Sequence, residues 1–502
     1  MSHLDDVRRL QRDLEDELPA TALSVDGRAF SFRAPIGGRP LPAGSYVALH
    51  GEGAVALGHI VSSELGFREV GYRGAEGGSG ELTGQFRIRM IEGEGTILGT
   101  IAEDGFTPGV ELQLRDAPLE PAPADAVAEF LAAPREDGGG LEVGGALHAD
   151  GAPVLFRAKG FARHSFLCGQ SGSGKTYSLG VILERLLTET GLRMVIVDPN
   201  SDFVRLGELR EGVDEPDYAQ AAEGVRVLRA AGRGGDAPLV LSFGDLDADA
   251  QATILGLDPL RDRGEFALFA EVSEGLGDGF SLADVERALR AHEDPEARPL
   301  ALRIRNLGVA RWELWEAESR RGSLHAELGG DWRCLVVDVG SLASPAQRAV
   351  ACQALLSDLW RRREGREPLL VVIDEAHNVC PQVPEDPLSA LATELAVLIA
   401  GEGRKFGLYL FLASQRPAKI HVNVLSQCEN LVLMRMVSAA DHDHVRDVFS
   451  HVPASLVAQA SEFRLGEGLA AGRIIDRPTP LRFGRRLSEE GGGDVPADWA
   501  GR

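Results

Sequence analysis

Hydrophobic and polar positions follow two different rhythms along this chain of 502 residues. Between about residues 22 and 115, short runs such as SYVALHG, GHIVSSE and QFRIRM alternate with a period of two and are separated by glycines. Such alternation is typical of half-buried β-strands bounded by turns. We therefore expect a small all-β unit, a β-barrel, over residues 21–115.

Beyond residue 146 the rhythm changes to continuous apolar blocks separated by helical periodicity, which is the pattern of a parallel α/β sheet. A helix is expected over 387–402, and residues 205–330 predict a mostly helical insertion, with segments such as LADVERALRAHE. The segments expected to contain buried strands are HSFLC before residue 169, 193–203, 333–342, 369–381, 407–417 and 430–436.

The remaining segments set the domain boundaries. Leucines and a valine recur on one side of 2–18, which predicts an N-terminal helix over 1–20. Proline, alanine and glycine dominate 116–145, which we interpret as a linker with one or two helical turns. The α/β domain then spans 146–485, and residues 486–502 form a tail.

A glycine-rich loop, GQSGSGKT, stands between the first strand and the first helix of the α/β part. A strand before such a loop and a helix after it are the context of a nucleotide-binding phosphate loop (Walker A). Lys175 is one of only four lysines in the chain, and we expect it to reach the β- and γ-phosphates of ATP, while Thr176 holds Mg²⁺. The residues expected to bind the nucleotide are Gly169, Gln170, Ser171, Gly172, Ser173, Gly174, Lys175 and Thr176.

A second acidic motif, LLVVIDEAHNVCP, ends a buried strand in two carboxylates. Strand ends line the ligand crevice of a parallel sheet, so we expect Asp374 to hold the Mg²⁺ shell and Glu375 to polarise the attacking water. Gln415 ends another strand and is a candidate sensor of the γ-phosphate. Together these motifs predict a RecA-like P-loop core of the ASCE class that hydrolyses ATP.

Charge and cysteine content limit the possible partners and compartments. With 52 basic and 76 acidic residues the net charge is -24, so DNA contact requires a local cationic surface such as a channel lining. The five cysteines show no metal or disulfide spacing and fit reduced core residues. No apolar run reaches the roughly 18 residues of a membrane span and no signal segment is evident, so we expect a cytoplasmic protein.

The DEAH string at 374–377 invites comparison with two-lobed helicases. The sequence after Glu375 is too short for a second lobe, so we expect His377 to pack locally. A one-lobed P-loop core needs a transition-state cation from a neighbouring subunit, which predicts a ring.

In their order, these motifs resemble the HerA branch of the HerA–FtsK ATPases: a barrel containing IEGEGTILG, then RHSFLCGQSGSGKT, VDPNSDF, VVIDEAHNVCP, EGRKFGLYLFLASQRP and VLSQCENLVLMRM. The resemblance covers about 25–480 and implies a homohexameric ring that hydrolyses ATP and moves double-stranded DNA through its channel. The resemblance implies that residues 169–176 form the Walker A loop, that Asp374 and Glu375 form the Walker B pair, and that Gln415 is the polar sensor. It also makes Arg404, Arg416 and Arg435 candidates for the trans-acting arginine, with Arg435 favoured. The stretch DPNSDF departs from the family pattern, which leaves the role of Asp202 open.

DNA contact is expected at Lys419 or Lys405, because both flank strand ends. Solvated loops and contacts between subunits are the alternatives for these lysines. With no base-reading motif in the sequence, contact should be to phosphates and sensitive to salt. Residues 441–444, DHDH, point in different directions on a helix and do not predict a metal site.

The chain shows no nuclease constellation, so the resemblance implies a separate effector, either a NurA-like nuclease in DNA end processing or a sirtuin-like, nuclease or Argonaute effector in antiphage defence. We expect it to dock on the barrel and the N-terminal helix. The alternative is an ATP-binding scaffold ring that organises an effector while moving little DNA. A conjugative or chromosome-partition pump is disfavoured, since the sequence has no membrane segment or DNA-reading winged helix.

Overall fold

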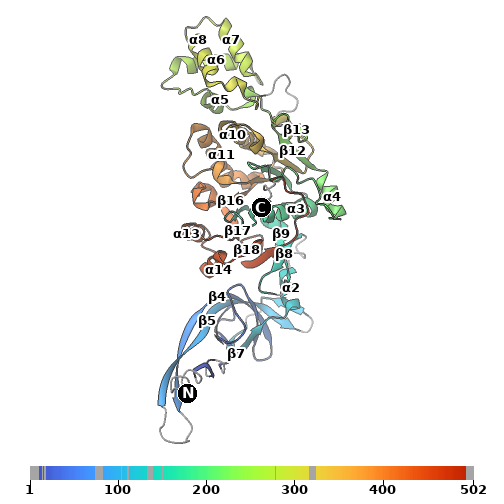
Figure 1. Cartoon of the computed structure of the whole chain (residues 1–502), viewed down its shortest axis with the longest axis vertical. Helices are drawn as coiled ribbons and strands as arrows, with labels where there is room; N and C mark the ends of the chain where they lie inside the picture. Colours follow the sequence, from blue (N-terminus) through green and yellow to red (C-terminus); the bar gives the residue numbers. More distant parts are fainter. Residues whose placement is uncertain are drawn as a thin grey trace, which may run out of the picture. The chain divides into compact units, whose positions relative to one another are not determined.

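A computed structural model describes residues 11–13, 15, 18–73, 83–102, 105–109, 112–132, 139–149, 151–277, 279–315 and 324–492. Most of the predicted N-terminal helix and residues 493–502 of the predicted tail lie outside these ranges. The chain divides into two compact units, Met1–Arg157 with Ser450–Phe483 and Ala158–Phe449 with Gly484–Arg502 (Figure 1).

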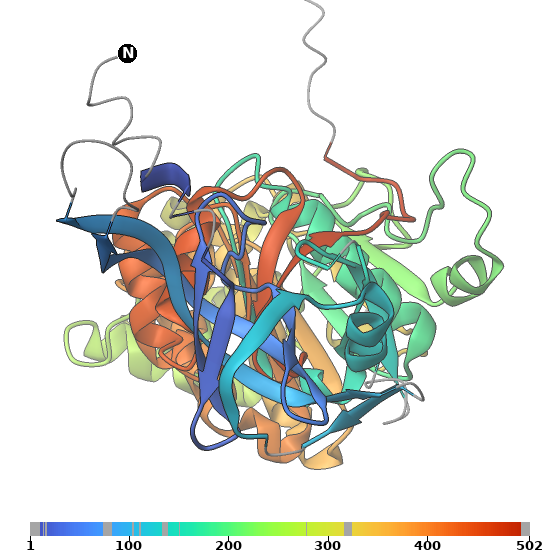
Figure 2. The same ribbon diagram turned by 90° about the horizontal axis from the view of Figure 1, so that it is seen from below.

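In the first unit, seven strands form one antiparallel sheet in the order β2-β1-β7-β3-β4-β5-β6. An additional pairing of β2 with β5 closes six of these strands into a ring, and their blue-to-cyan ribbons can be followed in Figure 2. The strands are β1 (Thr21–Ser24), β2 (Ala29–Pro35), β3 (Tyr46–His50), β4 (Val55–Arg73), β5 (Thr83–Ala102), β6 (Gly105–Pro108) and β7 (Leu114–Pro121).

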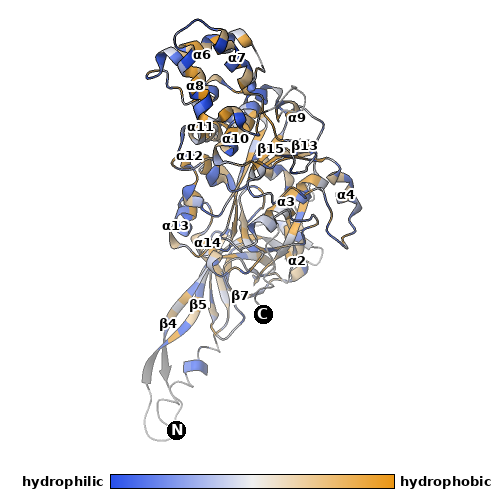
Figure 3. Ribbon diagram, turned by 45° about the horizontal axis from the view of Figure 1, so that its top comes forward, coloured by the Kyte–Doolittle hydropathy of each residue, from blue (hydrophilic) through white to orange (hydrophobic). Residues whose placement is uncertain are grey.

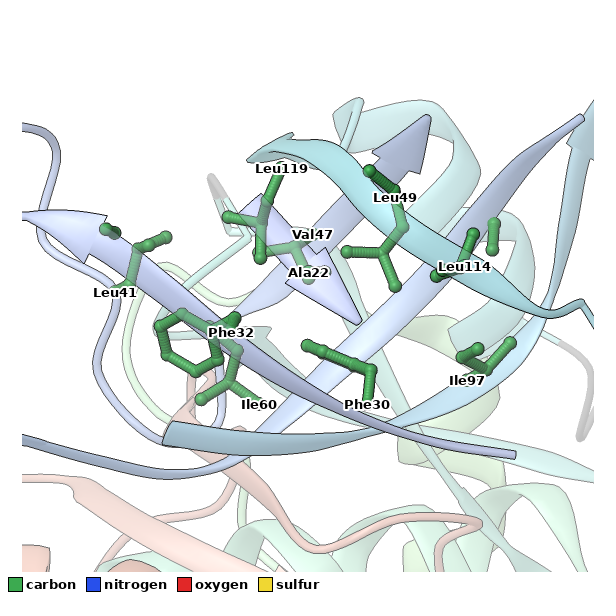
Figure 4. Packing of buried hydrophobic residues seen from close by; sticks show 13 residues of the cluster. Ala22, Phe30, Phe32, Leu41, Val47, Leu49, Ile60, Ile97, Leu114 and Leu119 are labelled. Atoms are coloured by element: carbon green, nitrogen blue, oxygen red, sulfur yellow. The ribbon is translucent and has the colours of Figure 1, made fainter. Parts of the chain in front are cut away.

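The interior of this closed sheet is apolar. Figure 4 shows side chains from opposite strands meeting there, among them Phe30, Val47 and Leu119. Two glycines of β5 leave room for close neighbours: a Cβ on Gly93 would lie 2.0 Å from the Ser62 carbonyl oxygen, and one on Gly95 would lie 2.2 Å from Cζ of the Phe30 ring. The spaced glycines of IEGEGTILG therefore have a packing reason in this sheet.

The rest of the first unit combines short helices with a second antiparallel run of strands, β18-β19-β8-β9. These elements are α2 (Ala124–Ala132), β8 (Gly140–Ala146), β9 (Pro153–Arg157), α14 (Ala454–Ala458), η10 (Gln459–Ser461), β18 (Glu467–Ala471) and β19 (Thr479–Phe483).

The second unit is built on eight strands in the order β13-β12-β14-β11-β15-β16-β10-β17, and the pairings between them are parallel. Every residue of β10, β14 and β15 is buried, as expected of strands covered on both faces. This confirms the predicted mixed α/β fold. The strands are β10 (His164–Cys168), β11 (Arg193–Val197), β12 (Val225–Arg229), β13 (Ala237–Pro238), β14 (Cys334–Val337), β15 (Leu369–Ile373), β16 (Leu408–Ser414) and β17 (Cys428–Met434).

Helices connect these strands, and α11 covers the residues predicted for it, Pro387–Glu402. Asp386 caps this helix by accepting hydrogen bonds from the amides of Leu388 and Ser389. The other described helices of the second unit outside the predicted insertion are η2 (Ala158–Ala162), α3 (Lys175–Glu189), η5 (Val339–Ser341), α10 (Pro345–Arg361), η6 (Arg362–Gly365), η7 (Ala376–Asn378), η8 (Gly403–Phe406), η9 (Pro417–Lys419), α12 (Val422–Leu425) and α13 (Ala439–Val448).

The span 205–330 contains helices and also two strands of the central sheet, β12 and β13. Figure 3 shows hydrophobic and hydrophilic residues alternating along α6, α7 and α8, as in helices that bury one face. The helices of this span are α4 (Pro216–Ala222), η3 (Phe243–Asp245), α5 (Ala248–Ile254), α6 (Arg263–Leu276), α7 (Leu282–Ala291), α8 (Ala297–Leu307), η4 (Val309–Arg311) and α9 (Leu324–Leu328).

All five cysteines are buried and none forms a disulfide. Among the described residues, no helix combines the length and hydropathy that a membrane crossing requires.

Candidate active site

Functional side chains gather at one edge of the central sheet, because parallel strands end on the same side. Six neighbouring strands, β14, β11, β15, β16, β10 and β17, are each followed at once by a glycine or a polar residue. In strand order these residues are Asp338, Asp198, Asp374, Gln415, Gly169 and Arg435.

The phosphate loop joins β10 to α3, and its glycines are required by geometry. Gly172 and Gly174 have φ of +71° and +92°, a region that glycine adopts without strain. A Cβ on Gly169 would lie 2.5 Å from Met434 Cβ on β17. The Gln170 amide donates to the Arg435 carbonyl oxygen at 2.9 Å, which ties the loop to the end of β17.

The loop leads directly into the first turn of α3, which begins at Lys175 and has no side-chain cap. Ser171 is exposed, while Ser173 is buried, and its hydroxyl makes no hydrogen bond within the described part of the chain. Thr176 is half-buried in the same turn. The helix N-terminus, with its free amides and positive dipole end, suits a phosphate.

Lys175 lies at the centre of the site with only 5% of its surface exposed. Its Nζ contacts Asp374 Oδ1 and lies 3.0 Å from Glu375 Oε1. Burial lowers the pKa of Lys175, but the charges of Asp374 and Glu375 outweigh burial and raise the pKa overall. The ammonium is therefore charged at neutral pH and faces two carboxylates.

Glu375 is held in one orientation by several contacts. The Gln415 amide donates to Glu375 Oε1 at 2.9 Å, so these two predicted residues meet. Burial raises the pKa of Glu375, yet the Lys175 charge and hydrogen bonds lower it overall, which keeps the carboxylate ionised at neutral pH. Its backbone has φ of +44°, an uncommon left-handed conformation for a glutamate.

His377, which the sequence predicted to pack locally, lies at the site, a role that the sequence analysis did not assign to it. Its Nδ1 lies 3.3 Å from Glu375 Oε2 and 3.0 Å from Ser414 Oγ, so the ring bridges Glu375 and the end of β16. Burial lowers the pKa of His377, so the ring is neutral at neutral pH. The short helix η7 turns His377 back toward Glu375, and this turn left no periodic signal in the sequence.

The three candidate arginines occupy different places. Arg435 donates from Nη2 to the Gly172 carbonyl oxygen at 3.0 Å, which holds it at the phosphate loop of its own chain. Arg404 donates to Glu429 at 3.0 Å beyond the opposite end of β16. Arg416 is exposed and lies along a cavity near the carboxyl end of β16. A role for Arg435 in a neighbouring subunit would require it to leave its own loop.

The divergent stretch DPNSDF forms a tight turn after β11. Asp198 accepts hydrogen bonds from the amides of Asp202, at 3.0 Å, and Phe203, at 2.8 Å. Burial raises the pKa of Asp202 to about 6, with a further contribution from the charge of Asp374. Asp202 is therefore close enough to Asp374 to interact with it electrostatically.

The donor set fits Mg²⁺ and a nucleotide triphosphate. The buried oxygens Asp374 Oδ2 and Glu375 Oε2 make no hydrogen bond within the described part of the chain. Carboxylate and hydroxyl oxygens are the ligands that Mg²⁺ prefers, and Thr176 supplies a hydroxyl at the start of α3. The glycine loop, the uncapped helix start and Lys175 supply the groups that hold phosphates.

Comparison with known proteins agrees with this geometry. Residues 141–279 match the family described as "Helicase HerA, central domain". This part of the chain is therefore similar to the central domain of HerA. The relationship predicted from the motifs is thereby confirmed, although the matched span includes the phosphate loop and ends before Asp374.

Curated proteins named HerA are also similar to part of this chain. The DNA double-strand break repair helicase HerA of Sulfurisphaera tokodaii is 30% identical over 167 residues, which are 32% of this chain and 33% of that protein. Its counterpart from Pyrococcus furiosus is 34% identical over 116 residues, 23% of this chain and 20% of that protein. The matched regions thus span a third or less of these relatives.

Among solved structures, VirB4 of Thermoanaerobacter pseudethanolicus has a TM-score of 0.49 and 17% identity, covering 70% of this chain and 97% of that one. The bacterial conjugative coupling protein TrwB has a TM-score of 0.45 and 14% identity, covering 70% of this chain and 91% of that one.

Proposed function

We propose that this chain is an ATPase that works as a homohexameric ring and moves double-stranded DNA through its channel. The observation that carries the proposal is the buried group of Lys175, Asp374 and Glu375, joined by Gln415, beside a glycine-rich loop at one sheet edge. This combination of a phosphate-binding cation, hard oxygen ligands and an ionised carboxylate suits hydrolysis of a phosphoanhydride.

Each residue has a defined role in the proposed reaction. Lys175 exchanges its carboxylate partners for the β- and γ-phosphates, and the loop amides hold the same phosphates. Thr176 and Asp374 would hold Mg²⁺, which supplies positive charge against the phosphates when bound. Glu375 accepts a hydrogen bond from the attacking water and orients it, while Gln415 fixes the Glu375 carboxylate.

The ring and the DNA substrate are proposed from the HerA-type domain and from the need for a second cation. The printed name of the curated relatives is a DNA double-strand break repair helicase. A neighbouring subunit would contribute an arginine to the transition state. Arg404 and Arg416 are candidates for this role, and Arg435 is one if it leaves Gly172.

We further propose that a separate nuclease or other effector, NurA-like or sirtuin-like, works with the ring in DNA end processing or antiphage defence. The alternative is a scaffold ring in which ATP organises the effector and little DNA moves. The two differ in one observable, because a translocase couples ATP turnover to its track. ATP turnover that rises when linear duplex is added supports translocation, whereas ATP turnover that does not change with duplex supports the scaffold.

The direct test of the catalytic assignment is the Glu375→Gln variant. Gln is nearly isosteric and keeps the contact with Gln415, but it cannot act as a base. We expect ATP binding to be retained and kcat to fall by about 10²–10⁴-fold, the usual contribution of a general base. Single-turnover hydrolysis with labelled ATP measures this, and a kcat close to that of the wild type would remove Glu375 from its role.

A further inference from the structure

A cavity of about 700 Å³ opens in the second unit near the carboxyl ends of β15 and β16. We call it the cationic pocket after three of its wall residues, Arg348, Arg416 and Lys419. Its walls include none of the phosphate-loop residues 169–176 and none of Asp374, Glu375 and Gln415. His377 does line the pocket, so the pocket adjoins the proposed catalytic centre at this residue.

Its cations are not neutralised internally. Among the described residues, neither Arg348, Arg416 nor Lys419 forms an ion pair, and Arg348 donates only to carbonyl oxygens, such as that of Leu342 at 3.2 Å. Many other arginines of this acidic chain do have carboxylate partners, as Arg226 does with Glu327 at 2.6 Å. Three unpaired cations in one cavity are thus a local exception to a net charge of -24.

Two carboxylates also line the pocket and have to be weighed against the cations. Asp386 is engaged as the cap of α11, where two backbone amides donate to it. Glu385 is exposed at the rim. A neighbouring cavity of about 350 Å³ shares Arg348 and adds Arg233, which is exposed and forms no ion pair among the described residues. The cationic surface therefore continues past the pocket along the same sheet edge.

The wall that carries Lys419 is rigidly attached to the segment that follows Glu375. The Gln382 amide donates to the Lys419 carbonyl oxygen at 2.8 Å, and the His421 amide donates to the Cys380 carbonyl oxygen at 2.9 Å. These bonds accompany a β-bridge between Pro381 and Ile420. The backbone position of Lys419 is therefore set before any ligand binds, which reduces the entropy lost on binding.

We propose that the cationic pocket binds the phosphodiester backbone of DNA, an inference that rests on the proposed DNA-translocating function. Unpaired arginine and lysine side chains around an open cavity match a chain of phosphates spaced along a backbone. The rest of the wall mixes apolar residues, such as Val339, Pro345 and an exposed Val383, with the polar residues Asn378, Gln382 and Ser389. Because the three cations would meet phosphates and not base edges, we expect binding to depend little on base sequence.

The pocket lies close enough to Glu375 for bound DNA to affect ATP hydrolysis. The Arg416 amide donates to Ser414 Oγ at 3.0 Å, and Ser414 contacts His377, which in turn contacts Glu375. A phosphate held by the 416–419 segment thus acts on the same loops that orient the Glu375 carboxylate. DNA bound in the pocket should raise ATP turnover through these contacts.

The test measures binding of fluorescently labelled blunt duplexes of two unrelated sequences by anisotropy, using the full chain at several salt concentrations. Lys419→Glu and Arg348→Glu should each lower the affinity for both duplexes about tenfold. Each should also reduce the slope of log affinity against log salt concentration by about one. Lys419→Arg keeps the charge and should retain affinity, which separates loss of charge from loss of folding. Lys405→Glu is the matched control, because this exposed lysine precedes β16 at the opposite sheet edge.

Each outcome has one meaning. Wild-type binding that is weakened by the two pocket variants and not by Lys405→Glu supports the inference. If the wild type binds duplex and the two pocket variants bind it equally well, the inference about the pocket is wrong and the proposed translocase is unaffected. Wild-type protein that hydrolyses ATP but binds no duplex at low salt overturns the translocase itself. Binding of polyglutamate in place of duplex assigns the pocket to an acidic protein segment and overturns the inference.

Discussion

Glu375 illustrates how much of the site depends on single side chains. Its left-handed backbone, with φ of +44°, costs about 1 kcal/mol or more and turns the chain immediately after β15. Gln415 donates a hydrogen bond to one carboxylate oxygen, and His377 Nδ1 lies 3.3 Å from the other while it bonds to Ser414. The sequence indicated Lys175, Asp374, Glu375 and Gln415, since each follows a strand or opens a helix. The contact of His377 depends on a three-residue helix that no periodicity reveals.

His377 is expected to act as a positioning residue. His377→Ala should lower kcat about tenfold with little change in KM for ATP, because removal of an orienting partner typically costs 10–100-fold. His377→Asn should recover much of the loss, since an amide can replace the ring as the partner of Ser414 beside Glu375. Steady-state ATPase assays separate the two constants, and a raised KM with unchanged kcat would contradict the role.

His164 provides a prediction for pH dependence. This histidine of β10 accepts a hydrogen bond from the Leu410 amide at 2.9 Å, and burial lowers its pKa to about 4. An unfolded histidine has a pKa near 6.5, so the unfolded state binds more protons between these values and stability falls as the pH drops through that range. At pH 5 the loss is about 2 kcal/mol.

The variant His164→Gln removes this titration. It is expected to be less stable than the wild type at pH 7. The difference in free energy of unfolding between the wild type and the variant should be smaller by about 2 kcal/mol at pH 5. Urea unfolding at both pH values measures the gap. An identical gap at the two values would show that His164 does not titrate as inferred.

At the scale of elements, helix α3 is locked between the phosphate loop and the segment after residue 484. Glu184 accepts hydrogen bonds from the amides of Leu487 and Ser488, each at 2.8 Å. Arg486 is fully buried against the same helix, where a Cβ on Gly180 would lie 2.6 Å from its Nε. These contacts join residues about 300 positions apart, so no local pattern could have predicted them.

Gly180→Ala should therefore destabilise the second unit. The Arg486 side chain has no room to withdraw, and overpacking of a buried site costs about 1–3 kcal/mol. Gly191→Ala is the matched control, because a Cβ there meets nothing within 4 Å. Chemical denaturation should show a lower free energy of unfolding for Gly180→Ala than for Gly191→Ala. Equal free energies would mean that the Arg486 side chain can move aside at little cost.

Strand prediction succeeded where burial is continuous and failed where it is partial. The blocks RMVIV and LLVVI became β11 and β15, whereas VRVLR, with two arginines, was assigned to a helical insertion and forms β12. The position of β12 comes from pairing with β14, a contact made across more than a hundred residues. The lengths of β4 and β5 likewise depend on their mutual pairing, which alternation in QFRIRM indicates only locally.

At the scale of the whole molecule, the account holds that one chain carries an incomplete ATP-cleaving site. The described core contributes the phosphate loop, the two carboxylates and Gln415, and we propose that a neighbouring copy contributes the final cation. Activity should then depend on assembly, because dilution separates subunits without altering any residue.

The most direct measurement is specific ATPase activity over a wide range of protein concentrations, with the mass of the particles determined in parallel by light scattering. The account predicts that activity per chain rises steeply as hexamers form and is nearly absent in the monomer. A monomer that hydrolyses ATP at the full rate of the assembled protein would contradict it.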